Sequence, residues 1–209
     1  GISSSNLKVI VVLALITSTY GAIRWVIAKN ELVGRPYWML SFSGLIILSI
    51  INRQIETLTA LTTIMVVAGG FVFLHSYASR LVKVLGYIML IGMIGLPFTP
   101  TALLWKDLIS SSGLVTSLWF AVTLGIIFIG TLRQLNRARP LSRDVELWMK
   151  FFYLVGLTLL FIVPWLTMTW GFREFYSAGF NFLSIVCFLI TSSGILVMRF
   201  KLADKLGQV

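Results

Sequence analysis

Long hydrophobic runs separated by short polar connections extend along the whole chain. An α-helix needs about 20 apolar residues to cross a hydrocarbon core of about 30 Å. On that measure the pattern predicts seven membrane spans, at residues 8–28, 36–52, 56–76, 82–104, 114–133, 148–170 and 177–199. The runs are too long and too uniformly apolar for the alternating pattern of a membrane β-strand. We therefore predict an all-α, polytopic membrane protein in which residues 1–209 form a single transmembrane domain.

The fourth predicted span contains two prolines near its end. Pro97 lacks an amide proton and its ring clashes with the preceding turn, so a helix through this span must break or kink near Leu96. Pro100 repeats the interruption three residues later. The hydroxyls of Thr99 and Thr101 can satisfy freed carbonyl groups, as hydroxyl residues do in other interrupted membrane helices. The pattern therefore predicts a helix that is discontinuous at Pro97.

A lysine and an aspartate, Lys106 and Asp107, follow this break. Lys106 lies nine residues after Pro97, which is about 13 Å of rise in a helix. If the span ends near Trp105, the charged pair is an interfacial anchor beside an aromatic residue of the membrane boundary. If the helix is discontinuous, the pair is drawn into the membrane and becomes a candidate ion relay. The residues alone leave both interpretations open.

Composition and charge narrow the class of protein. The chain is 58% hydrophobic and 11% charged, which excludes an ordinary soluble domain. A net charge of +10 would suggest nucleic acid as the partner of a soluble protein, but here the basic residues lie in the connections, so we expect no nucleic-acid partner. We expect anionic lipids on the cytoplasmic side to be partners instead.

The distribution of the basic residues predicts an orientation. Thirteen of the 17 lysines and arginines fall in the connections on one side of the predicted membrane. The positive-inside rule then places the C-terminus in the cytoplasm and the N-terminus outside. An outside N-terminus without a signal sequence is expected of a chain whose earlier spans precede these residues.

Few residues offer catalytic or ligating chemistry. The sequence has no glycine-rich phosphate loop and no serine, histidine and aspartate set, so we expect no catalytic centre, cofactor or metal site. His75 is the one histidine. An imidazole can relay a proton or ligate a pigment magnesium or a haem iron, but a single histidine without a second ligand also fits an ordinary interfacial residue.

Arg35 precedes a short span. The 16 residues from Pro36 to Ile51 give about 24 Å of helix, and proline suits a first helical position, so the helix is expected to begin at Pro36 with Arg35 near the membrane surface. The alternative is an intramembrane cation paired with Glu31 or Glu56. Glu56 is the poorer partner because a whole bilayer separates it from Arg35.

The stretch GLPFTPTALLWKDLI, residues 95–109, resembles the broken-helix segment of the antiporter-like subunits of respiratory NADH:quinone oxidoreductase and of multisubunit cation/proton antiporters. In that family a glycine, an apolar residue and a proline open a discontinuous helix. A lysine or glutamate on the proton path follows about ten residues later. Gly95, Leu96 and Pro97 match the opening, and Lys106 with Asp107 matches the charged site.

The resemblance extends over about residues 8–112. Arg35 is similar to the second residue of a basic pair in the family. Gly34 stands where the family has a channel lysine, and Gly69 with Gly70 occupies the region of another relay lysine.

The resemblance implies a subunit of a larger membrane complex, with other membrane subunits as partners. Lys106 would be the proton relay and Asp107 its partner, with Arg35 and His75 as further relay candidates. The alternative is a structural or assembly subunit without a transport path, which the two glycines at lysine positions favour. A scaffold for pigments, with His75 facing a cofactor cavity, is a third interpretation.

Overall fold

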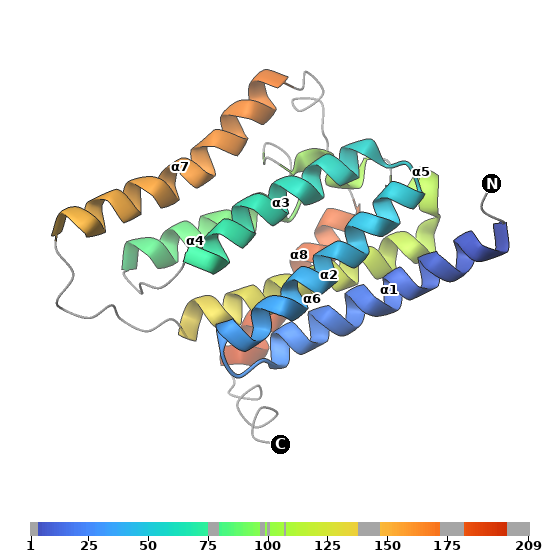
Figure 1. Ribbon diagram of the computed structural model, residues 1–209, viewed down its shortest axis with the longest axis horizontal. Helices are drawn as coiled ribbons and strands as arrows, with labels where there is room; N and C mark the ends of the chain where they lie inside the picture. The colour runs from blue at the N-terminus through green and yellow to red at the C-terminus, as the bar shows by residue number, and fades with distance from the viewer. Residues whose placement is uncertain are drawn as a thin grey trace.

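The computed structural model describes residues 4–74, 80–96, 99, 101–106, 108–137, 147–171 and 182–199, and within these residues it contains helices and no strand (Figure 1). The elements are α1 (Ser4–Ile27), α2 (Glu31–Ile51), α3 (Ile55–Leu74), α4 (Arg80–Met93), the 3₁₀-helix η1 (Ala102–Trp105), α5 (Leu108–Ser112), α6 (Leu114–Arg137), α7 (Leu147–Gly171) and α8 (Phe182–Arg199). The predicted all-α class is confirmed.

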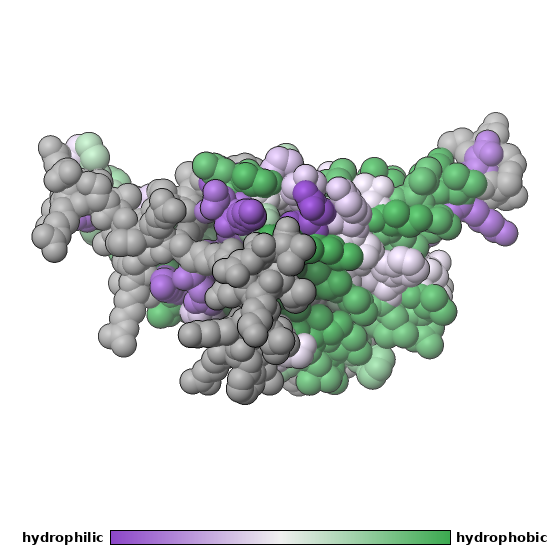
Figure 2. Space-filling model, turned by 90° about the horizontal axis from the view of Figure 1, so that it is seen from below, coloured by the Kyte–Doolittle hydropathy of each residue, from purple (hydrophilic) through white to green (hydrophobic). Residues whose placement is uncertain are grey.

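Five of the described helices are long and apolar enough to cross a membrane: Asn6–Ile27, Glu31–Ile51, Ile55–Val72, Leu114–Asn136 and Trp148–Thr167. Val82–Met93 and Phe182–Gly194 are shorter apolar helices. Hydrophobic side chains cover much of the described surface in Figure 2, as expected where lipid replaces water as the solvent. These helices support a multi-pass membrane protein.

Small residues bring α1 and α2 into close contact. A Cβ at Gly21 would lie 2.7 Å from the carbonyl oxygen of Tyr37, so only glycine allows the two backbones this approach. The hydroxyl of Ser41 donates a hydrogen bond of 2.6 Å to the carbonyl of Ser18 across the same interface. The two helices therefore form an antiparallel pair held by backbone proximity.

Helix α6 lies behind this pair and joins it to α8 (Figure 1). The indole nitrogen of Trp25, on α1, donates to the carbonyl of Ile127 at 3.2 Å and lies 3.3 Å from the hydroxyl of Thr131, both on α6. Helix α7 is peripheral, contacts α3 and α4, and has few buried side chains. The buried core is built mainly by α1, α2, α3, α4 and α6.

The second span begins five residues earlier than predicted. Helix α2 starts at Glu31, and Pro36 lies inside it as the sixth residue, so the expectation that the helix begins at Pro36 is wrong. Asn30 has extended backbone angles and its carbonyl accepts the amide of Gly34 at 3.1 Å, which starts the helix there. Arg35 consequently lies in the second turn of the helix, four residues after Glu31.

Candidate functional site

The fourth span is interrupted, as the prolines predicted. Helix α4 ends at Met93 and helical geometry returns at Ala102, in η1. The break was expected near Leu96, and the helix ends three residues earlier. Gly95 has a φ of +79°, a left-handed conformation that favours glycine and turns the chain before the prolines are reached. Pro97 and Pro100 themselves lie outside the described residues.

Side chains satisfy the backbone groups that the break exposes. The hydroxyl of Thr101 accepts a hydrogen bond from the amide of Gly95 at 3.1 Å and donates one to the carbonyl of Gly92 at 2.9 Å. The indole of Trp105 donates to the carbonyl of Ile94 at 2.9 Å. Trp105 is 1% exposed, so its indole packs inside the bundle against the break. The interruption is therefore an internally bonded structure.

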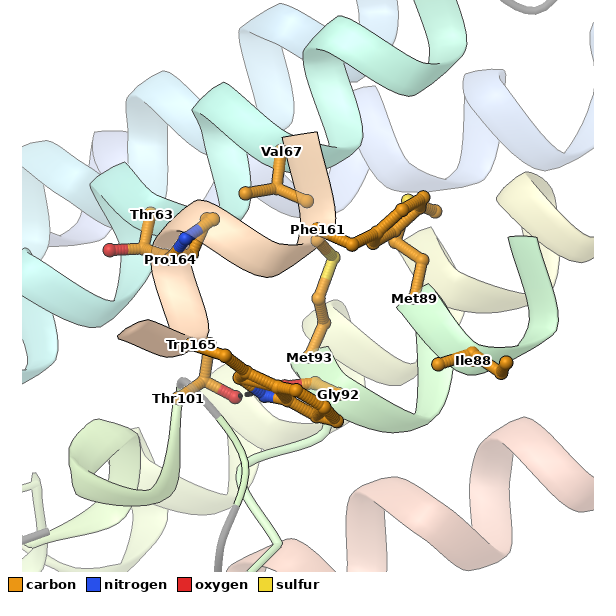
Figure 3. A pocket seen from close by; sticks show the side chains of 10 residues that line it. All are labelled: Thr63, Val67, Ile88, Met89, Gly92, Met93, Thr101, Phe161, Pro164 and Trp165. Atoms are coloured by element: carbon orange, nitrogen blue, oxygen red, sulfur yellow. Dashed lines mark hydrogen bonds between the residues drawn. The ribbon is translucent and has the colours of Figure 1, made fainter. Parts of the chain in front are cut away.

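A small cavity lies beside the break, between α3, α4 and α7 (Figure 3). The side chains around it include Met89, Met93, Phe161 and Trp165, and its lining is apolar although Thr101 borders it. Apolar cavities of this kind stay dry because water would find too few hydrogen-bond partners. The lining of the cavity thus offers water few hydrogen-bond partners.

Lys106 follows η1 and forms an ion pair with the first turn of α3. Its Nζ lies 2.9 Å from Oε1 of Glu56, and the side chains are 44% and 24% exposed. The hydroxyl of Thr57 donates to the carbonyl of Leu104 at 2.9 Å and fixes η1 against the same turn. The ammonium group therefore lies at the end of the span, level with the start of α3. Asp107 lies outside the described residues.

Two buried acceptor oxygens lie on the turn that carries Glu56. Within the described part of the chain, Oε2 of Glu56 and Oε1 of Gln54 are buried without a hydrogen-bond partner. The amide nitrogen of Gln54 lies 2.5 Å from the hydroxyl of Ser111 and 3.2 Å from that of Ser112. The Glu56 carboxylate therefore keeps one buried oxygen that can accept a further hydrogen bond beside the ammonium group of Lys106.

Arg35 is paired with Glu31, the partner that the sequence favoured. Its Nε and Nη2 lie 3.1 and 2.5 Å from Oε1 of Glu31, and Nη2 also donates to the carbonyl of Val72 at 3.2 Å. Val72 lies 16 residues after Glu56 on α3, which is about 24 Å of helix. Arg35 and Lys106 therefore lie at opposite ends of the bundle and are not brought together.

Tryptophan rings occupy the space above two of the glycines that stand at lysine positions in the resemblance. A Cβ at Gly34 would lie 2.5 Å from a ring carbon of Trp25, and one at Gly69 would lie 3.1 Å from a ring carbon of Trp38. The two tryptophans are 0% and 1% exposed. A lysine would have no room at Gly34 without displacing the indole of Trp25, and a side chain at Gly69 would press on Trp38.

From the sequence, Asp107 was the expected partner of Lys106, and Glu56 was weighed as a partner for Arg35. The available signal was topological, because the end of the fourth span and the start of the third lie on the same side of the membrane. His75 lies outside the described residues. Within the described residues there is no group of three or more histidine, cysteine, aspartate or glutamate side chains that could hold a metal ion.

Comparisons of the chain with models of known protein families, with curated proteins and with solved structures find no match.

Proposed function

We propose that this chain is a subunit of a larger membrane complex, and that its interrupted fourth span carries the end of a proton path at which Lys106 exchanges a proton with Glu56. The observation that carries the proposal is the ion pair itself, 2.9 Å long, at the end of a break whose backbone groups are internally bonded. That distance is within the reach needed for direct proton transfer.

The break gives this pair its position. A continuous helix after Met93 would direct the residues of η1 elsewhere, whereas the turn at Gly95 returns the chain to α3 and brings Lys106 to Glu56. The likeness of residues 95–109 to the broken-helix segment of antiporter-like subunits supports the same role. Interrupted helices in membranes commonly line ion sites, because irregular backbone there has to be matched by polar partners.

The basic connections orient the path. With the C-terminus in the cytoplasm and the N-terminus outside, the turn between α2 and α3 faces outward. Lys106 and Glu56 then lie on the outer side, and Arg35 and Glu31 lie on the cytoplasmic side. The proposed pair is the outer exit or entry point for protons, and Asp107, Arg35 and His75 remain secondary relay candidates. Other membrane subunits supply the rest of the path.

A second candidate function is a structural subunit without conduction. It is favoured by the placement of charge, because the described acidic and basic side chains lie within about two turns of span ends. Gly34 and Gly69 carry no ionisable group, and the rings of Trp25 and Trp38 fill the space beside them. In this alternative Lys106 and Glu56 anchor the break at the membrane boundary.

Substituting arginine for Lys106 separates the two functions. Arginine keeps the positive charge and can pair with Glu56, but it does not release its proton at any physiological pH. Proton uptake by native membrane vesicles, divided by the amount of assembled complex, is the measurement. A relay predicts that Lys106→Arg and Lys106→Ala both abolish uptake.

A structural role gives a different pattern in the same vesicles. Lys106→Arg then keeps both assembly and uptake per complex, whereas Lys106→Ala lowers the amount of assembled complex. Lys8→Ala is the matched control, because Lys8 is an exposed lysine at the start of α1 and belongs to neither ion pair. It should leave uptake unchanged in either case.

A further inference from the structure

An arginine and two tyrosines form a cluster at the end of the bundle opposite Lys106. Arg24 lies in the last turn of α1, and its Nη2 is 3.4 Å from the hydroxyl of Tyr37 on α2. The guanidinium carbon lies 5.1 Å from the centre of the same ring, and Tyr20 contacts that ring edge-on at 6.2 Å. Stacking on an aromatic face restricts the guanidinium to one orientation.

Within the part of the chain that the structure describes, no carboxylate forms an ion pair with Arg24. The two ion pairs in the described residues are Arg35 with Glu31 and Lys106 with Glu56, and the contacts of Arg24 are with the side chain of Tyr37, beside Tyr20. A guanidinium has five N–H donors, and the bond to the tyrosine hydroxyl uses one of them. Because the side chain is exposed, it has donors to spare for an anion, and a guanidinium fork matches the oxygens of a phosphate.

An exposed apolar strip leads along α1 to this arginine. Leu13, Ile16 and Tyr20 are 56%, 54% and 52% exposed, and their spacing of three and four residues places them on one face of the helix with Arg24. From Leu13 to Arg24 the strip is about 16 Å long. Since α1 is long and apolar enough to cross a membrane, this exposed strip would lie against acyl chains in a bilayer.

We propose that Arg24, oriented by Tyr37, binds the phosphate of an anionic phospholipid whose acyl chain lies along the strip from Leu13 to Tyr20. Two features select a lipid. The cation lies at the end of a membrane span, where headgroups are found, and the apolar strip continues from it into the bilayer. A soluble acidic peptide would have no use for the strip. The site does not depend on the proton path.

Native mass spectrometry of the protein released from mixed micelles tests this site. The micelles contain either phosphatidylglycerol or phosphatidylcholine, and retained lipid is counted per protein. Wild type should retain phosphatidylglycerol in preference to phosphatidylcholine. Arg24→Ala should retain about fivefold less phosphatidylglycerol, the loss expected for one basic side chain at a membrane surface.

Three further variants make the result specific. Lys8→Ala removes an exposed cation from the other end of α1 and should retain phosphatidylglycerol as wild type does. Arg24→Lys keeps the positive charge but loses the planar guanidinium that stacks on Tyr37. Its retention of phosphatidylglycerol should therefore lie between those of wild type and Arg24→Ala. Tyr37→Phe removes only the hydroxyl that orients Arg24 and should also reduce retention, which keeps the test valid if Arg24→Ala folds poorly.

Two results would overturn the site. One is equal retention of phosphatidylglycerol by Arg24→Ala and Lys8→Ala. The other is an Arg24→Ala variant that keeps its lipid but loses a protein subunit that copurifies with wild type, because Arg24 would then bind a protein partner.

Discussion

Replacing Thr101 with valine should destabilise the protein through the break in the fourth span. Valine has nearly the same shape as threonine but has no hydroxyl. The substitution leaves the amide of Gly95 and the carbonyl of Gly92 without the bonds of 3.1 and 2.9 Å that Thr101 makes, at a position that is 1% exposed. The free energy of unfolding should therefore fall.

The size of the loss follows from the number of bonds. A single side-chain hydrogen bond within a membrane protein contributes about 0.6 kcal/mol on average and up to about 1.7 kcal/mol. Leaving buried partners unsatisfied raises the cost toward about 1–3 kcal/mol per group. For two bonds made by one hydroxyl, we expect a loss of about 1–3 kcal/mol for Thr101→Val.

The assay is reversible unfolding in mixed micelles by titration with a denaturing detergent, followed by far-ultraviolet circular dichroism. Thr101→Ser is the matched variant, because it keeps the hydroxyl and loses one methyl group, worth about 0.8 kcal/mol. The reasoning predicts that Thr101→Val is less stable than Thr101→Ser. A valine variant as stable as the serine variant would refute the view that this hydroxyl holds the break together.

Two further stability predictions use the same assay. Gly34→Ala should destabilise the protein by about 1–3 kcal/mol, because the added Cβ would lie 2.5 Å from a ring carbon of Trp25. Gly156→Ala, a helical glycine with nothing within 4 Å of a new Cβ, should instead be neutral or stabilising by up to about 1 kcal/mol, and equal losses at both positions would contradict this. Glu31→Gln should lower the free energy of unfolding by less than about 1 kcal/mol, because the ion pair with Arg35 is partly exposed. If the same loss of stability were measured in high salt, its origin would not be electrostatic.

The architecture was largely predictable because hydrophobic run length reports directly on membrane spans. The predicted break also follows from the absence of an amide proton in proline. The position of the break was less accessible, because the helix ends at Met93 through the left-handed turn at Gly95 and the hydrogen bonds of Thr101. The hydrogen bonds of Thr101 form only once the turn at Gly95 has brought the residues together, so the hydrophobic pattern of the sequence does not predict them.

The partners of the charged residues were only partly predictable. Glu31 and Arg35 are four residues apart, so their pairing follows once the helix extends back to Glu31. The pair between Lys106 and Glu56 joins two spans, and it depends on how far the interrupted chain travels along α3. The sequence left open whether the span ends near Trp105, and it gave no sign that the indole is buried and donates to the carbonyl of Ile94.

The most direct test of the account exchanges the two charges of the proposed relay. Lys106→Glu and Glu56→Lys each place two like charges together, whereas the double variant restores one ammonium group and one carboxylate at the same place. The measurement is proton uptake per assembled complex in native vesicles. We expect each single variant to lose uptake and the double variant to recover a substantial part of it. Single variants that take up protons at the wild-type rate would contradict it.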